Sequence, residues 1–230
     1  MFWIFKTLFL YLCIMAKPSK NTVVLSILFF GPLLFYLFLL TGTNNFAKLP
    51  RLTENIDDVE TFSSADTIKL ENNISVLCFL GADLLNHKTN ALNLNEKIYK
   101  HFYGFKGFQF VVVLPKGSEA DAQQLKKELG ATYNVDKWHF VFGDGAEVER
   151  MFGSLKTSYS LDDQYYTPYA FIIDRELTLR GRNDEEAEEE GLLYGYNAES
   201  VATVHQEMVD DVKVVMAEYR LALKKNKREI

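Results

Sequence analysis

The sequence predicts an α/β fold, three layers thick around a mixed central sheet, preceded by one N-terminal transmembrane helix. Three observations lead to this prediction. Residues 22–40 carry no charge. From residue 67 onward, apolar runs typical of buried strands alternate with segments whose apolar residues recur at helical spacing. Near residue 178 two strand-like runs follow each other without a helix between them, which predicts an antiparallel hairpin at the end of a parallel sheet.

The segment at residues 22–40 is the predicted membrane span. Its nineteen uncharged residues would extend roughly 28 Å as a helix, about the thickness of the hydrocarbon core of a bilayer. Lys17 and Lys20 precede it, and Lys48 is the first charge after it. The positive-inside rule then predicts a single-pass membrane protein with a cytoplasmic N-terminus and a periplasmic or other extracytoplasmic C-terminal domain. A cleaved signal peptide is the alternative interpretation.

The first fourteen residues form a second, shorter apolar stretch, broken by Lys6. It is too short to span a bilayer. We therefore expect translation to begin at Met15, with residues 1–14 an over-extended start. Residues 1–21 are the predicted cytoplasmic N-terminus. If residues 1–14 are part of the protein, they would form a helical hairpin or lie in the membrane interface, and the topology would then differ.

The rest of the chain divides into a lead-in, one domain and a tail. Residues 41–66 are polar and predicted to be a tether, and residues 226–230 are a short basic tail. The domain at residues 67–225 should begin with a hairpin and end with a long helix. The predicted strands are 67–70, 74–80, 108–115, 138–143, 169–174 and 178–182, and the predicted helices are 88–104, 118–129, 146–155 and 200–225.

The charge balance narrows the function classes. The net charge is −6, and the sequence lacks the clustered Lys and Arg that a phosphate-binding surface needs, so a nucleic-acid partner is not expected. No Gly-rich phosphate loop and no Ser-His-Asp set is present. The remaining candidate for a functional site is the stretch SVLCFLGADLLNH (75–87), where an apolar strand ends in a glycine loop that leads into a helix.

Three stretches of the sequence, in this order of strands and helices, resemble the corresponding stretches of a known family. They are CFLG before the first helix, FVFGDGAEVERMFG after the third strand, and TPYAFIIDRELTLRGR around the final hairpin. Together with one N-terminal membrane helix, they resemble the Sco/SenC family of copper chaperones for cytochrome oxidase, which belongs to the thioredoxin-like superfamily. The resemblance covers about residues 50–225. It implies a thioredoxin-like fold and a protein partner in the assembly of a respiratory complex.

The chemistry of that family does not carry over to this chain. Its members hold copper with two Cys in a CxxxC loop and one His ahead of a Pro-led strand, since soft thiolates select copper. Here the loop at residues 81–90 has no Cys, and Tyr165, Tyr166 and Thr167 stand where the His is expected. We therefore expect no metal, no cofactor and no catalytic activity, with copper binding as the weaker alternative.

Cys78 and His87 are the candidates for any residual chemistry. Cys78 could be a lone nucleophile, but it lies inside an apolar strand, where burial makes a thiol inert. His87 lies in the loop where ligands would be, without a second ligand at matching spacing. The two residues define the alternative hypothesis of a metallochaperone or single-Cys thiol enzyme.

Thr167 and Pro168 are the family feature that this chain keeps. The resemblance implies a cis proline whose preceding residue meets the backbone of a bound partner, and hence a docking edge beside the loop. A trans proline at a strand start is the other interpretation. The preferred hypothesis is a membrane-tethered docking or assembly factor for cytochrome c oxidase; a structural module of another envelope complex is a further alternative.

Overall fold

The computed structural model describes residues 19–41, 48–63, 68–131, 134–183 and 191–226, and the chain forms two units, Met1–Phe46 and Ala47–Ile230. The unit boundary lies within the predicted lead-in. The predicted start at Met15 and most of the basic tail lie outside the described residues.

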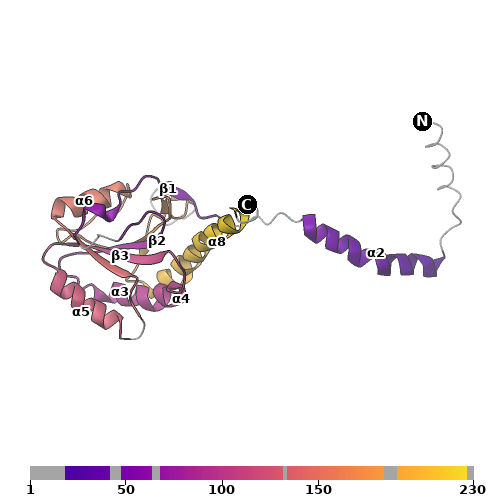
Figure 1. The fold of residues 1–230 in the computed structure, drawn as a ribbon, viewed down its shortest axis with the longest axis horizontal. Helices are drawn as coiled ribbons and strands as arrows, with labels where there is room; N and C mark the ends of the chain where they lie inside the picture. Colours follow the sequence, from indigo (N-terminus) through magenta and orange to yellow (C-terminus); the bar gives the residue numbers. More distant parts are fainter. Residues whose placement is uncertain (1–18, 42–47, 64–67, 132–133, 184–190, 227–230) are drawn as a thin grey trace, which may run out of the picture. The chain divides into compact units, whose positions relative to one another are not determined.

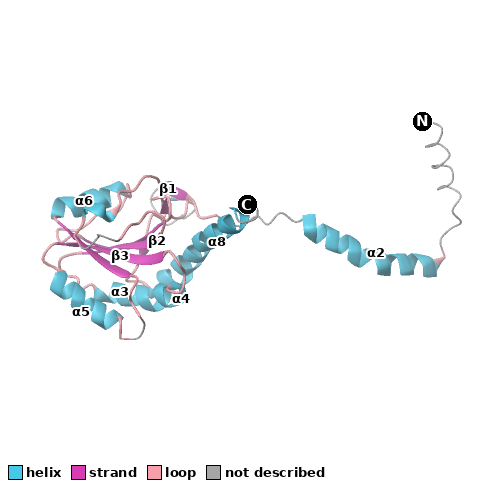
Figure 2. Ribbon diagram, in the orientation of Figure 1, coloured by secondary structure: helices cyan, strands magenta, loops and turns pink. Residues whose placement is uncertain are grey.

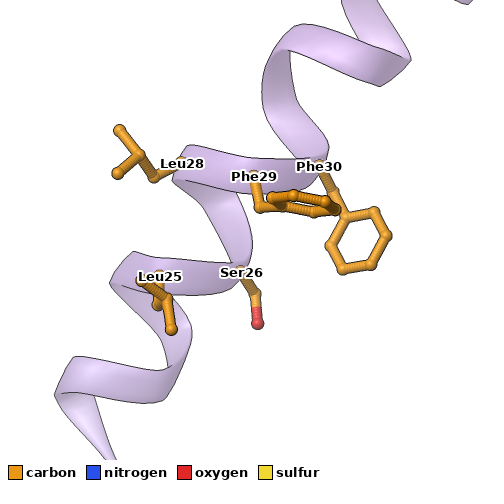
Figure 3. Close-up of a pocket in the computed structure, with 5 residues that line it drawn as sticks. All are labelled: Leu25, Ser26, Leu28, Phe29 and Phe30. Carbon is orange, nitrogen blue, oxygen red and sulfur yellow. The ribbon is translucent and has the colours of Figure 1, made fainter.

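Helix α2 (Lys20–Thr41) is the described part of the first unit, and it confirms the helix predicted over residues 22–40. Its large apolar side chains are exposed, from Val23 at 41% to Phe29 at 73%. Leu25, Ser26, Leu28, Phe29 and Phe30 line a hollow whose walls all come from this one helix (Figure 3). Among the residues that can be described, no helix combines the length and the apolar character needed to cross a membrane. The predicted membrane span is thus not confirmed.

The second unit is built on a mixed sheet that lies between helical layers (Figure 2). Three neighbouring strands, which reach one edge of the sheet, pair in parallel, and the strands after them in the chain pair antiparallel. Their order across the sheet is β1-β6-β5-β2-β3-β4, with β7 also paired to β5. The strands are β1 (Arg51–Thr53), β2 (Ile74–Leu80), β3 (Phe108–Pro115), β4 (Trp138–Gly143), β5 (Tyr166–Ile173), β6 (Leu179–Arg180) and β7 (Tyr196–Asn197).

Helices cover both faces of the sheet, as predicted (Figure 1). One core packs α3, α5 and α8 against alternate residues of β3 such as Phe110 and Val112. The other packs α6 against Val111 and Val113, because successive side chains of a strand point to opposite faces. The helices are η1 (Val59–Thr61), α3 (Lys88–Leu94), the π-helical η2 (Asn95–Tyr99), α4 (Lys100–Phe102), α5 (Glu119–Leu129), α6 (Gly145–Ser154), α7 (Val201–Thr203), the π-helical η4 (Val204–Met208) and α8 (Val209–Asn226).

This topology fits the order of elements that the sequence predicts. Two strand–helix units place β2 and β3 side by side in parallel, and a third adds β4 at the edge. The final hairpin, β5 and β6, then pairs antiparallel with β2. The domain has the α/β fold with a mixed central sheet that the sequence predicts.

Two parts of the prediction are wrong. Residues 68–70 do not form a strand, because β2 already has β3 on one side and β5 on the other; the backbone N–H of Leu70 instead donates to Asp58 Oδ1 at 2.8 Å. The described part of the lead-in, predicted to be a tether, belongs to the domain. It contributes β1 to the sheet, and it buries Ile56, Val59 and Phe62 in the core.

A buried ionic network joins this lead-in to β6 and α8. The Arg180 side chain is 3% exposed, and its Nη1 donates to Asp174 Oδ2 at 3.0 Å. Its Nη2 donates to both carboxylate oxygens of Glu218, and its Nε donates to the carbonyl oxygen of Leu49 at 3.0 Å. The backbone N–H of Leu49 also donates to Glu218. Both backbone polar groups of Leu49, where the chain enters the domain, are therefore hydrogen-bonded to this network.

Candidate functional site

The stretch 75–87 runs from β2 through a tight loop to the start of α3. Gly81 ends the strand with φ +72°, a left-handed conformation that favours glycine. An added Cβ at this position would lie 2.7 Å from the carbonyl oxygen of Gln164 and 2.9 Å from Cβ of Tyr166. The next residue, Ala82, donates its N–H to the same Gln164 carbonyl at 2.8 Å. The loop is therefore held against the segment that leads into β5.

Cys78 lies within β2, away from this loop. It pairs with Val112 of β3 and Ala170 of β5, and it is 3% exposed. Burial raises the pKa of its thiol to about 12. The thiolate is the form of cysteine that attacks substrates and binds metals, and the Cys78 thiol stays protonated. Cys78 is therefore a residue of the hydrophobic core.

The burial of Cys78 gives a direct prediction. With a pKa of about 12, only about one thiol in ten thousand is ionised at pH 8. In a Cys13→Ser background, we expect an alkylating reagent to modify Cys78 only as fast as the protein unfolds, and fully in denaturant. The control is an added thiol at exposed Ala82 in a chain without Cys78, which should react in the folded state. Rapid native modification of Cys78 would contradict its burial.

His87 is the half-buried residue just before α3, and its ring stacks on that of Tyr166. The ring centroids are 3.5 Å apart and the planes differ by 13°. The Tyr166 hydroxyl donates to Glu199 Oε1 at 2.6 Å and accepts from Asn90 Nδ2 at 3.0 Å. Burial, followed by the bond to Glu199, raises the pKa of this hydroxyl. Tyr166 is therefore held as a neutral phenol by three side chains from α3, its preceding loop and the β7–α7 turn.

The sequence did not indicate the part that Asn90 and Glu199 take in this cluster. Asn90 is a buried polar residue in α3, and Glu199 lies two positions after β7, a strand that the sequence analysis did not predict. Nothing in the local pattern marks either residue. In the sequence, Tyr166 is distinguished only by its position, where the resemblance places a metal-binding His.

The Thr167–Pro168 bond is trans, so the cis expectation is wrong. Thr167 is 2% exposed, and the Pro168 carbonyl oxygen accepts the N–H of Ala198 at 2.8 Å. The following residue, Tyr169, pairs with Asn197 of β7. The edge that the resemblance reserves for a partner backbone is thus occupied by the chain's own β7.

No metal site emerges from the described residues: no three of their His, Cys, Asp and Glu side chains gather closely enough to hold an ion. Cys78 lies in the core between two strands, whereas His87 stacks on Tyr166 at the start of α3. The alternative hypothesis needs both residues at one accessible site, and the burial of Cys78 argues against it.

Comparisons with known proteins give similarities of low identity. No protein-family model and no curated protein matches the chain. Among solved structures, BsSco, a member of the Sco family of cytochrome c oxidase assembly proteins, is 16% identical, with coverage of 74% of this chain and 96% of its own and a TM-score of 0.46. A SCO1/SenC family lipoprotein from Bacillus anthracis is 12% identical, with coverages of 76% and 99% and a TM-score of 0.46. The thioredoxin domain of a thiol-disulfide oxidoreductase from Bacteroides vulgatus is 14% identical, with coverages of 65% and 93% and a TM-score of 0.36. These similarities establish neither a family nor an activity for the chain.

The hydroxyl of Tyr166 can be tested separately from its ring. Tyr166→Phe keeps the stack on His87 but leaves Asn90, which is 3% exposed, without this acceptor. We expect a loss of about 1 to 2 kcal/mol in the free energy of unfolding, measured by denaturant titration. Tyr36→Phe, at an exposed position of the other unit, is the control and should change nothing. A variant as stable as the parent would show that the two hydrogen bonds contribute no net stability.

Proposed function

We propose that the protein is a non-catalytic docking factor that acts in the assembly of a respiratory complex, cytochrome c oxidase by its resemblance to Sco/SenC proteins. The proposal that the protein is non-catalytic rests on one observation: the residues at the positions of the family's metal ligands. The resemblance places two thiolates in the loop at residues 81–90, where this chain has no Cys, and a His where this chain has Tyr166, which is bonded to Asn90 and Glu199. The Cys78 thiol is buried in β2. A domain that keeps a stable fold without reactive groups is suited to binding rather than to exchange chemistry.

The proposed attachment point is the N-terminal helix. The large apolar side chains of α2 are exposed over its length, and none of residues 22–40 is charged. Apolar surface of this extent calls for a lipid or protein environment. We place it at a membrane, with the domain on the extracytoplasmic side, as the positions of Lys17, Lys20 and Lys48 suggest.

Deletion and complementation test the docking role. Cells lacking the protein should lose oxidase content and activity, and the wild-type gene, Cys78→Ser and His87→Ala should each restore both. Rescue by wild type but by neither variant would support the metallochaperone or thiol-enzyme alternative, which copper titration of the full chain would then examine. Unchanged oxidase in the deletion strain would contradict the proposal outright.

Membrane attachment is measured separately, by extraction of native membranes with alkaline carbonate. The chain should stay in the pellet, and a chain lacking residues 20–41 should be released. Release of both would show that a soluble protein partner, rather than lipid, covers α2.

A further inference from the structure

A cavity of about 310 Å³ lies between helix α5 and strand β4. Its size is at the lower end of the range for small-molecule sites, about 300 to 1,000 Å³. Because β4 is the edge strand of the sheet, no further strand of the sheet order closes this side of the cavity. The apolar part of the wall is formed by buried side chains, those of Ile68, Ala122, Phe140 and Phe142. The cavity therefore offers room and an apolar wall for one small ligand.

Three polar residues on one face of α5 line the same cavity: Glu119, Gln123 and Lys126. Their spacing of four and three positions places them on the same face of the helix. Glu119 already accepts the backbone N–H of Gly117 at 2.9 Å. Lys126 forms no ion pair with any residue of the described chain, and no acidic residue lies three or four positions from it. Within the described chain, Lys126 is therefore a cation at the cavity wall without a counter-charge.

His139 adds a second basic group to this wall. Its side chain is half-buried, and burial, followed by the nearby Lys126 ammonium, lowers the pKa of its ring. The two groups are thus close enough to repel each other when both are charged. A negative group placed at this wall would relieve the repulsion, whereas a positive group would add to it.

We propose that the α5–β4 cavity binds a small apolar carboxylate, whose carboxylate group pairs with Lys126 and whose apolar body lies against Phe140 and Phe142. A single carboxylate fits better than a nucleotide or a phosphate ester, because Glu119 also lines the cavity and repels further negative charge. The end of a peptide chain with an apolar last residue has the same chemistry as a free acid. The cavity shares no lining residue with the Tyr166 cluster, and the proposal does not depend on the docking function.

Binding is measured on the full chain in uncharged detergent, from the NMR shifts of the His139 ring protons, with exposed His101 as the internal reference. Three probes share one apolar body and differ in charge: phenylpropionate, phenylpropionamide and phenylpropylamine. Phenylpropionate should shift His139 saturably, and the amide and the amine should bind about tenfold more weakly or not at all. Added salt should weaken phenylpropionate, because the charge pair is partly exposed.

Neighbouring residues on α5 supply two matched pairs of variants. Lys126→Gln should weaken phenylpropionate binding about tenfold, whereas Lys127→Gln removes the same charge outside the cavity and should bind like the parent. Gln123→Trp should fill the cavity and abolish binding, whereas Gln124→Trp should not. All four positions are exposed, so the fold should tolerate each change.

Equal binding of the acid and the amide, or equal binding by the two members of either pair, would overturn the proposed site. So would the absence of any His139 shift with phenylpropionate. An acetylated tripeptide that ends in Phe, with its carboxyl end free or amidated, then distinguishes the sources of the carboxylate. Competition by the free-ended peptide alone would assign the cavity to the end of a peptide chain, and no competition by either would assign it to a free acid. Both of these results support a carboxylate site, whereas competition by the amidated peptide would contradict it.

Discussion

Replacing Arg180 with alanine is expected to lower the free energy of unfolding by about 3 to 5 kcal/mol. The side chains of Arg180 and Asp174 are 3% and 0% exposed, and Glu218 is 18% exposed. Without the guanidinium, the carboxylates of Asp174 and Glu218 lose their cation and the Leu49 carbonyl oxygen loses its donor. The free energy of unfolding therefore falls because buried carboxylates are left without a cation, and not only because a contact is lost.

Arg51→Ala is the matched control, because Arg51 lies opposite Arg180 in the β1–β6 pair. It too is bonded to a carboxylate, that of Glu176, but its side chain is 45% exposed. An exposed pair contributes at most about 1 kcal/mol. Denaturant unfolding of the full chain, followed by Trp fluorescence, measures both variants. Similar losses of free energy of unfolding in the two variants would mean that solvent reaches the Arg180 network and that this network does not hold the lead-in on the domain.

Arg180→Met separates charge from packing. Methionine fills much of the volume but leaves both carboxylates uncompensated, so we expect it to be nearly as destabilised as Arg180→Ala. Combining it with Asp174→Asn and Glu218→Gln should recover a substantial part of the loss, since no buried charge then remains. Failure to recover would show that Arg180 acts through its packing against Leu49.

The sequence predicts the elements of the fold that carry long apolar patterns. Strands β2 and β3 are buried at every position, and they appear in the sequence as continuous apolar runs. Helix α6 is predicted from its sequence pattern, and the structure shows that a capping box of Asp144 and Glu147 begins it. By contrast, β1 and β7 have three and two residues, too short to show a period, and they exist because longer strands offer them an edge. Tertiary pairing, rather than local preference, makes these strands.

The place of the candidate site was predictable, but its contacts were not. A strand, a glycine and a following helix locate the loop after β2 in the sequence. The bonds of Tyr166 to Asn90 and Glu199 instead join residues 76 and 33 positions apart, and no local pattern encodes them. The cis expectation for Pro168 failed for the same reason, since it took no account of β7, whose pairing with β5 sets this part of the strand.

Gly81→Ala is expected to lower the free energy of unfolding by about 2 to 4 kcal/mol. The backbone at this position has φ +72°, and the new Cβ would lie 2.7 Å from the Gln164 carbonyl oxygen. That oxygen belongs to the backbone and is bonded to Ala82, so it cannot move without opening the loop. Gly104→Ala is the control, because an added Cβ there has no atom within 4 Å and the change should stay within about 0.5 kcal/mol.

The same variant shows what the glycine does for the site. Tyr166 Cβ lies 2.9 Å from the added methyl group, so the Tyr166 ring must shift relative to His87. NMR shifts of the His87 ring protons, which the stacked phenol ring perturbs, should change in Gly81→Ala and not in Gly104→Ala. A Gly81→Ala protein as stable as its control, with unchanged His87 shifts, would mean that the loop and the start of β5 separate in solution. The loop would then be open to ligands, and the proposal of a non-catalytic role would lose one of the observations that support it. The expected result would instead show that the closed loop requires glycine at position 81 for packing. The presence of Gly81 would then be no evidence of catalysis.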